Sequence, residues 1–201
     1  MDELHVNKSY PTAAALIGDA RFALQALEKE LSDKTSGNGR APGSVAAEVK
    51  SARDSAMAQY RDVMAATDKP INPYRVYAGL MEVLDPNKSF VTHESGNTRD
   101  QLSTVYETLV PRGFLGWGNV SSLGFSLAAT IAAKISFPDK HCVAVTGEAG
   151  LGYMMGNLEV ALREKLGITV VHVSNGGFSG YGPGFWGDGH DPFTYKVTGN
   201  D

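Results

Sequence analysis

The fold class follows from residues 141–178, HCVAVTGEAGLGYMMGNLEVALREKLGITVVHVSNGGF. Apolar runs at His141–Thr146 and Ile168–Val173 predict two strands that are buried on both faces, and Met154–Lys165 has the periodicity of a helix. Buried strands that alternate with helices are typical of parallel sheets. We therefore predict an α/β fold, in which a parallel sheet carries helices on both faces.

The upstream sequence continues this alternation. Nearest to the segment above, we predict a helix that starts at Asn72-Pro73, a strand at Ser89–His93, a polar turn at 94–97, a glycine-dotted stretch at 113–122 and an Ala-rich helix at Leu123–Ile135. Further upstream, we predict a β-like run at Ala13–Ile17, a helix that opens at Gly18-Asp19, a polar linker at 32–44 and a surface helix at 45–67. The chain then divides into residues 1–31, a linker and surface helix at 32–68, and a larger domain at 69–201.

Composition excludes several classes of partner. The 201 residues carry a net charge of −4, so there is no basic surface for nucleic acid. No apolar run approaches the roughly 20 residues that span a bilayer, so we expect no membrane association. The single cysteine, Cys142, cannot form an internal disulfide, which favours a reducing cytoplasm. We expect it to be a buried thiol.

Polar loops follow both strands of the first segment. Gly147–Gly150 (GEAG) follows one strand and 174–177 (SNGG) follows the next, which places Glu148 and Asn175 27 positions apart. The carboxyl ends of parallel strands share one edge of the sheet, where such folds bind ligands. Carboxylate and amide oxygens suit Mg²⁺, glycines let phosphates approach the backbone, and a helix starting near Tyr153 would direct its positive end there. From the residues alone, tight strand-to-loop turns remain the alternative.

These motifs resemble the signature of thiamine diphosphate (ThDP)-dependent enzymes, usually Gly-Asp-Gly followed by Asn-Asn. The chain is similar to the carboxy-terminal ThDP-binding domain of the acetolactate synthase, oxalyl-CoA decarboxylase and benzoylformate decarboxylase group. The stretches KPINPYRVYAGLMEVL and NVSSLGFSLAATIAAK extend the likeness over residues 69–201. Residues 1–31, with ALIGDARFALQAL, resemble the end of that group's central domain.

The resemblance implies a role for each loop. Glu148, Asn175 and the carbonyl of Gly177 would bind Mg²⁺, and Leu123 would lie beneath the cofactor and bend it into its reactive V shape. The implied cofactor-binding residues are Ser95, Gly96, Asn97, Thr98, Ser121, Ser122, Leu123, Gly147, Glu148, Ala149, Gly150, Asn175, Gly177 and Phe178. No residue of this chain is assigned a catalytic role.

The implied function is the ThDP- and Mg²⁺-binding part of a 2-oxo acid decarboxylase or carboligase-type enzyme. Such an enzyme breaks or forms a C–C bond through a ThDP carbanion, on a small 2-oxo acid or an acyl-CoA substrate. Two positions depart from the signature: Glu148 replaces aspartate and Ala149 replaces glycine.

The group activates ThDP with a glutamate on the pyrimidine-binding domain of a neighbouring subunit, and 201 residues leave no room for that domain. We therefore expect a fragment, truncated before the cofactor domain is complete, that needs a pyrimidine-binding domain from another chain in a homo- or hetero-oligomer. A true small subunit is the alternative origin. The alternative function is a non-catalytic or regulatory partner with the ThDP fold.

Other residues have simpler interpretations. Gly147–Gly152 also resembles a dinucleotide-binding glycine pattern, but the next strand ends at Ser174-Asn175 without the acidic residue that NAD binding needs. We expect His172 to be a core histidine whose polar atoms are satisfied, and Glu94 to cap a turn. We assign no catalytic role to His190 and Asp191, and packing roles to Trp117, Phe185 and Trp186.

Overall fold

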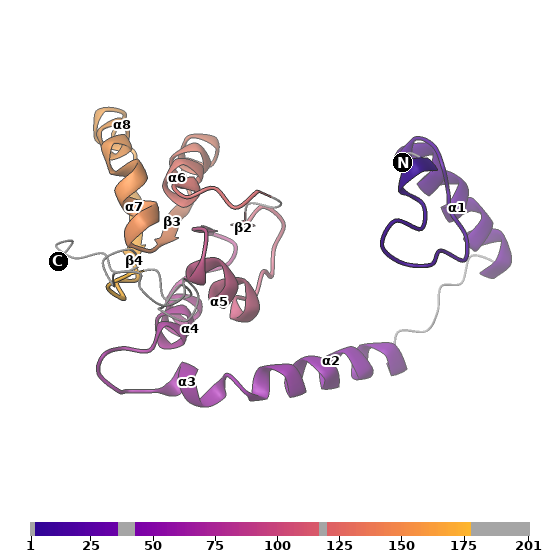
Figure 1. Cartoon of the computed structure of the whole chain (residues 1–201), viewed down its shortest axis with the longest axis horizontal. Coiled ribbons are helices and arrows are strands. Elements are labelled where there is room, and N and C mark those ends of the chain that lie inside the picture. Colours follow the sequence, from indigo (N-terminus) through magenta and orange to yellow (C-terminus); the bar gives the residue numbers. More distant parts are fainter. Residues whose placement is uncertain (1–2, 36–42, 117–119, 178–201) are drawn as a thin grey trace, which may run out of the picture. The chain divides into compact units, whose positions relative to one another are not determined.

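The computed structural model describes residues 3–35, 43–116 and 120–177. The chain forms two compact units, Met1–Asp54 and Ser55–Asp201 (Figure 1). His190, Asp191, Trp117, Phe178, Phe185 and Trp186 lie outside the described residues. Among the helices described, none combines the length and the apolar character that a bilayer crossing requires.

The first unit contains a short 3-10 helix, Glu3–His5, the helix α1, Ala20–Thr35, and the start of α2, Gly43–Ala58. Helix α1 begins where predicted, because the Asp19 carboxylate accepts hydrogen bonds from the backbone N–H of Arg21 (2.9 Å) and Phe22 (3.3 Å). The prediction of a β-like run at Ala13–Ile17 is wrong. No described residue of this unit forms a partner strand, and a strand needs one to satisfy its backbone.

The second unit contains the remaining elements. In chain order these are α3 (Arg61–Ala65), α4 (Pro73–Val83), β1 (Ser89–His93), α5 (Asn97–Val105), β2 (Phe114–Leu115), α6 (Phe125–Ser136), β3 (His141–Thr146), α7 (Glu148–Met154), η2 (Met155–Asn157), α8 (Leu158–Arg163) and β4 (Ile168–His172). The four strands pair in the order β2-β1-β3-β4, and every pair is parallel. The predicted α/β class is confirmed.

Helices cover both faces of this sheet. Alternate residues of β1 and β3 point to opposite faces. Val91, Val143 and Val145 pack with Tyr77 of α4 and Leu102 of α5, whereas Leu127 of α6 and Ala161 of α8 form a cluster that includes Val170 of β4. Figure 1 shows α6 and α8 on one side of the strands and α4 and α5 on the other. The sheet is therefore the middle layer of three.

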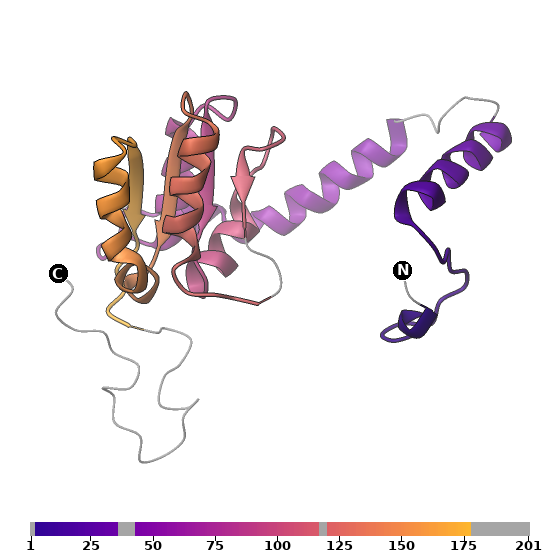
Figure 2. The same ribbon diagram turned by 90° about the horizontal axis from the view of Figure 1, so that it is seen from above.

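The topology places a crevice between β1 and β3. From β1 the chain passes through α5 to β2 on one side, and then through α6 to β3 on the other side of β1. Loops that leave neighbouring strands in opposite directions open a crevice at the carboxyl edge, where ligands bind in such sheets. In Figure 2 the strands lie side by side and end at the same lower edge.

Several predicted elements have different bounds in the structure. The strands at Ser89–His93 and His141–Thr146 are confirmed, and β4 ends one residue earlier than expected. The predicted surface helix at 45–67 is interrupted at Gln59 and Tyr60 between α2 and α3. Helix α5 was not predicted, because its polar start at Asn97 was interpreted as the end of a turn.

The helix expected near Tyr153 begins much earlier, so that prediction is wrong. The N–H of Leu151 already donates to the carbonyl of Gly147 (3.0 Å), which makes Glu148 the first residue of α7. The 3-10 turn η2 then separates α7 from α8, so the predicted single helix at Met154–Lys165 is interrupted. The GEAG motif is therefore the first turn of a short helix that starts directly after β3.

Candidate functional site

A pocket of about 340 Å³ opens at the crevice between β1 and β3. It is lined by the loop after β1, the turn before α6, the start of α7 and the loop after β4. The residues that line it are Pro73, Glu94, Ser95, Gly96, Asn97, Thr98, Gln101, Ser121, Leu123, Gly147, Glu148, Ala149, Gly150, Val173, Asn175 and Gly177. The structure thus brings together all the sequence-predicted site residues except Ser122, which does not line the pocket, and Phe178, which lies outside the described residues.

Glu148 joins the ends of β3 and β4. Its Oε1 accepts hydrogen bonds from the backbone N–H of Asn175 (2.5 Å) and Gly176 (2.7 Å), and from the hydroxyl of Ser174 (3.2 Å). The residue is buried, with 6% of its surface exposed, yet it lines the pocket. One carboxylate oxygen therefore anchors the SNGG loop to the GEAG turn.

Asn175 contributes an amide group next to this carboxylate. Its Oδ1 accepts a hydrogen bond from the N–H of Gly177 (3.1 Å), which closes a tight turn over Gly176, whose φ is 77°. Glycine adopts this left-handed conformation without steric cost. The alternative interpretation as a tight strand-to-loop turn is therefore correct for the local backbone. This turn holds Asn175 at the wall of the pocket.

The donor set at this edge fits a hard cation. Glu148, Asn175 and Gly177 line the same pocket and offer a carboxylate, an amide and a carbonyl oxygen, which are the ligand types of Mg²⁺. Hydrogen bonds from the SNGG loop occupy Oε1 of Glu148, and the carboxylate has a second oxygen. Among the described residues, no three His, Cys, Asp or Glu side chains gather as a metal cluster, so a cation here would depend on amide and carbonyl oxygens.

The start of α5 forms the opposite wall. Gly96 precedes the helix with φ at 80°, and α5 then presents its first backbone N–H groups at the carboxyl edge of the sheet. Thr98 is 4% exposed and lines the pocket, and its Oγ1 has no hydrogen-bond partner. A buried hydroxyl without a partner is costly, so this atom marks a position where a polar ligand group would be stabilised.

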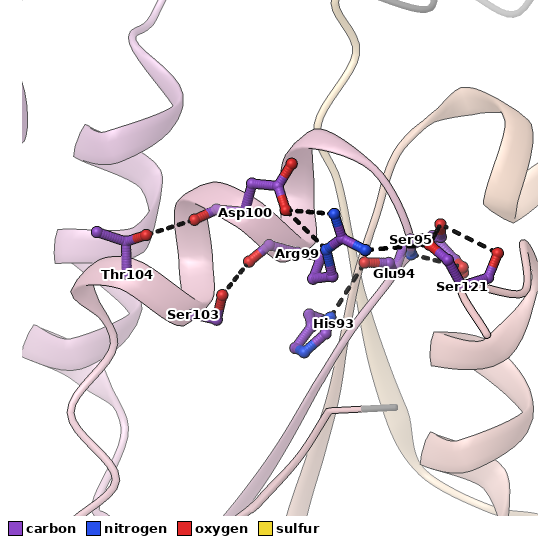
Figure 3. Close-up of polar contacts among 8 residues, drawn as sticks. All are labelled: His93, Glu94, Ser95, Arg99, Asp100, Ser103, Thr104 and Ser121. Carbon is purple, nitrogen blue, oxygen red and sulfur yellow. Dashed lines mark hydrogen bonds and ion pairs between the residues drawn. The ribbon is translucent and has the colours of Figure 1, made fainter. Parts of the chain in front are cut away.

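The turn before α6 is fastened to the start of α5 (Figure 3). The Oγ atoms of Ser95 and Ser121 are 2.7 Å apart, and the guanidinium of Arg99 donates to the Ser121 hydroxyl (3.2 Å). Ser121 has φ at 58°, a conformation that a non-glycine residue adopts at some cost. These contacts hold the turn that presents Leu123, which is 38% exposed, to the pocket.

Glu94 is a pocket residue whose role the sequence did not indicate. It follows β1 and is 1% exposed, and its carboxylate accepts four hydrogen bonds. The donors are the backbone N–H of Ser95 (2.9 Å), Gly124 (3.0 Å) and Ser126 (3.2 Å) and the hydroxyl of Ser126 (2.8 Å). The prediction that Glu94 caps a turn describes the Ser95 contact alone, because the other donors lie 30 or more positions away.

Three further pocket residues were not predicted as site residues, Pro73, Gln101 and Val173. The hydroxyl of Tyr77 donates to Oε1 of Gln101 (3.0 Å). Burial raises the pKa of the Tyr77 phenol well above its ordinary value of 10.0, so this group stays neutral and remains a donor at physiological pH. The core residue Tyr77 therefore fixes the side chain of Gln101. In the sequence, only its amide group indicated that Gln101 could belong to a site.

The remaining candidates lie away from the pocket. Cys142 is buried, as predicted, and burial raises the pKa of its thiol, so it is a packing residue. The prediction that His172 is a satisfied core histidine is wrong: the residue lies in β4 but is half-buried, and its buried Nε2 has no partner. His93 is buried, its Nδ1 lies 3.1 Å from the carbonyl oxygen of Glu94, and its ring packs on Phe114. None of the three lines the pocket.

Comparison with known proteins identifies a family segment that includes the loops around the pocket. Residues 94–183 match the family described as "Thiamine pyrophosphate enzyme, C-terminal TPP binding domain", in which thiamine pyrophosphate is another name for ThDP. The matched segment contains the loop after β1, the turn before α6, the GEAG turn and the SNGG loop. This segment is therefore similar to the carboxy-terminal cofactor-binding domain of ThDP-dependent enzymes.

The curated relatives include proteins named as acetolactate synthase and as 2-hydroxyacyl-CoA lyase. The chain is 32% identical over 114 residues to a probable acetolactate synthase large subunit of Methanocaldococcus jannaschii, covering 54% of this chain and 19% of the relative. It is 28% identical over 181 residues to the corresponding protein of Methanococcus aeolicus (85% and 29%) and 26% identical over 183 residues to 2-hydroxyacyl-CoA lyase of Arabidopsis thaliana (89% and 31%). The chain therefore spans between about a fifth and a third of the length of these relatives.

Proposed function

We propose that the pocket between β1 and β3 binds ThDP together with Mg²⁺. The observation that carries the proposal is the convergence of Glu148, Asn175 and Thr98 on one pocket at the carboxyl edge of the sheet. Glu148, Asn175 and the Gly177 carbonyl would hold the cation, which neutralises the diphosphate. The glycines of the GEAG turn would let the phosphates approach the backbone closely.

In this proposed mode of binding, Thr98 would contact one end of ThDP and Leu123 the other. The unpartnered Thr98 hydroxyl and the first N–H groups of α5 would meet phosphate oxygens, because a helix N-terminus favours an anion. Leu123 offers an apolar side chain at the other wall, against which the rings of the cofactor would rest. Bound ThDP supplies an electron sink for breaking or forming a C–C bond beside a carbonyl group.

The proposed activity is that of a 2-oxo acid decarboxylase or carboligase-type enzyme, acting on a small 2-oxo acid or an acyl-CoA type substrate. It rests on the family and on relatives named as acetolactate synthase and 2-hydroxyacyl-CoA lyase. We also propose that a pyrimidine-binding domain completes the site from another chain or another region, within a cytoplasmic homo- or hetero-oligomer. The domain division at residues 1–31, 32–68 and 69–201 belongs to the same proposal.

One observation favours a second candidate, a non-catalytic partner with the ThDP fold. Glu148 is one methylene longer than the aspartate of the family signature, and its Oε1 already accepts three hydrogen bonds from the SNGG loop. A carboxylate that is satisfied in this way stabilises the loops without a cation. Binding measurements separate the two candidates, because only the first requires Glu148 for affinity toward Mg²⁺ and ThDP.

The test is calorimetric titration of ThDP into the purified chain, with and without Mg²⁺. Glu148→Ala and Asn175→Ala should each abolish the Mg²⁺-dependent heat. Glu159→Ala is the matched control, because Glu159 is exposed on α8 and pairs with Arg163 far from the pocket lining. Folded wild-type chain that releases no heat with ThDP and Mg²⁺ would refute the proposed binding and leave the non-catalytic partner.

A further inference from the structure

Glu94 holds three walls of the pocket together although little of it reaches the surface. Its carboxylate accepts hydrogen bonds from the loop after β1 through Ser95, and from the turn before α6 through Gly124 and Ser126. The third wall, α7, packs directly on the side chain: a Cβ on Gly150 would lie 2.3 Å from Cγ of Glu94. Gly150 therefore allows α7 to approach the glutamate as closely as it does.

The carboxylate takes the place of a local cap on α6. Gly124, the residue before α6, has φ at 93° and no side chain to satisfy the first N–H groups of the helix. Glu94 accepts from Gly124 with Oε1 and from Ser126 with Oε2, so a side chain 30 positions upstream does this work. A negative charge at a helix N-terminus is also favoured by the helix dipole.

All four contacts require an acceptor. Two backbone N–H groups point at Oε1, and one N–H and one hydroxyl point at Oε2. In the described part of the chain no lysine or arginine forms an ion pair with this carboxylate. Three backbone N–H groups and the Ser126 hydroxyl therefore stabilise the carboxylate, and its position follows the backbone around Gly124 and Ser126.

We propose that Glu94 is a positioning residue that sets where Leu123 stands in the pocket. Leu123 is the residue before Gly124, so the bond from Gly124 to Glu94 fixes the backbone that carries it. This inference rests on the proposed function, in which Leu123 supports the rings of ThDP. Glu94 itself acts through Leu123, since its own oxygens are occupied by backbone and hydroxyl donors.

Two probes separate the ring-binding wall from the diphosphate-binding wall. Inorganic diphosphate with Mg²⁺ would meet Thr98 and the GEAG turn but would not reach the Leu123 side. Glu94→Gln should therefore weaken ThDP binding roughly ten-fold, the effect of losing a hydrogen bond to a charged group. It should leave the affinity for inorganic diphosphate within about two-fold of wild type. The contacts of diphosphate lie on the other wall, and a substitution that shares no contact with a bound group has little effect on its binding.

A double-mutant cycle tests whether Glu94 works through Leu123. Leu123→Ala should weaken ThDP binding by itself. The double variant with Glu94→Gln should bind ThDP less than about two-fold more weakly than Leu123→Ala alone. Ser126→Ala is a milder variant that removes one donor while keeping the side chain of Glu94, and it should show the same split between the two probes. The proposal would be overturned if the losses of ThDP affinity in the two single variants multiplied in the double variant. Equal losses of affinity for ThDP and for inorganic diphosphate would also overturn it.

Amide hydrogen exchange of the ligand-free chain gives a readout that is independent of any cofactor. Glu94→Gln should speed exchange at Gly124 and Ser126, because their N–H groups lose a charged acceptor. Unchanged exchange at both positions would also overturn the proposal. If wild-type chain fails to bind ThDP while exchange changes as expected, the proposed function and this use of Glu94 both fail, and Glu94 remains as the cap of α6.

Discussion

Two buried glutamates stand at the carboxyl edge of the sheet, and they use their oxygens differently. Glu94 follows β1 and accepts bonds on both oxygens from four donors. Glu148 follows β3, and the SNGG loop bonds to its Oε1. A carboxylate with both oxygens engaged can hold structure and nothing more, whereas one with an oxygen to spare can also meet a ligand. Position at the edge is therefore a weaker indicator of binding than the number of donors already satisfied.

The largest effect on stability should come from a substitution that crowds the side chain of Glu94. Gly150→Ala would place a Cβ 2.3 Å from Cγ of Glu94, inside a buried contact. We expect it to lower the free energy of unfolding by about 3 kcal/mol, the upper range for overpacking a core. Urea denaturation followed by circular dichroism measures this loss.

Gly152→Ala is the matched control, because Gly152 lies in the same helix and an added Cβ would meet nothing within 4 Å. It should be neutral or stabilise the chain by up to about 1 kcal/mol, through helix propensity. Equal effects of the two substitutions would mean that α7 does not approach Glu94 as closely as described.

The same isosteric substitution should affect the two glutamates unequally. Glu94→Gln must place an NH₂ group against existing donors, so we expect a loss of about 2 kcal/mol in the free energy of unfolding. Glu148→Gln can keep a carbonyl oxygen toward the SNGG loop and turn its NH₂ toward the pocket, at a cost below about 1 kcal/mol. Thermal and urea unfolding of both variants test this ranking, and a larger loss at Glu148 would reverse the comparison.

Tyr77, a core residue whose hydroxyl donates to the pocket residue Gln101, offers a small effect with a pH signature. Burial raises the pKa of Tyr77 above its ordinary value of 10.0, so the folded state keeps a proton that the unfolded chain releases. The stabilisation is complete below pH 10 and is lost as pH rises beyond it, by about 1 kcal/mol over one pH unit. In unfolding measurements between pH 8 and 11, Tyr77→Phe should show a shallower decline than wild type, and an unchanged slope would contradict this origin.

Local patterns predicted the strands and the two most informative loops. Ser89–His93 and His141–Thr146 are apolar runs of strand length, and both strands have the predicted bounds. The pair Glu148 and Asn175 could be found because each residue directly follows its strand, and strand order places the two loops side by side. Their spacing and residue types also carried the resemblance to ThDP-dependent enzymes, which the family match confirms.

Helix boundaries and long-range contacts could not be predicted in this way. Glycines at 147, 150 and 152 disfavour a helix by propensity, yet α7 begins at Glu148 because the chain must turn back over β3. The polar start of α5 resembled a turn, since its buried apolar residues, Leu102 and Val105, lie in the second half of the helix. In both places tertiary packing outweighed local preference.

The sequence by itself determined the fold class, the parallel strands and the loops that follow them, because these depend on hydrophobic period and on residue types close together in the chain. Only the tertiary structure decided the part played by Glu94, since its partners Gly124 and Ser126 lie 30 and 32 positions away. It also decided that Gly150 must lack a side chain and that the Thr98 hydroxyl has no partner. Such features depend on which backbones approach one another in space, and no periodicity along the chain encodes that.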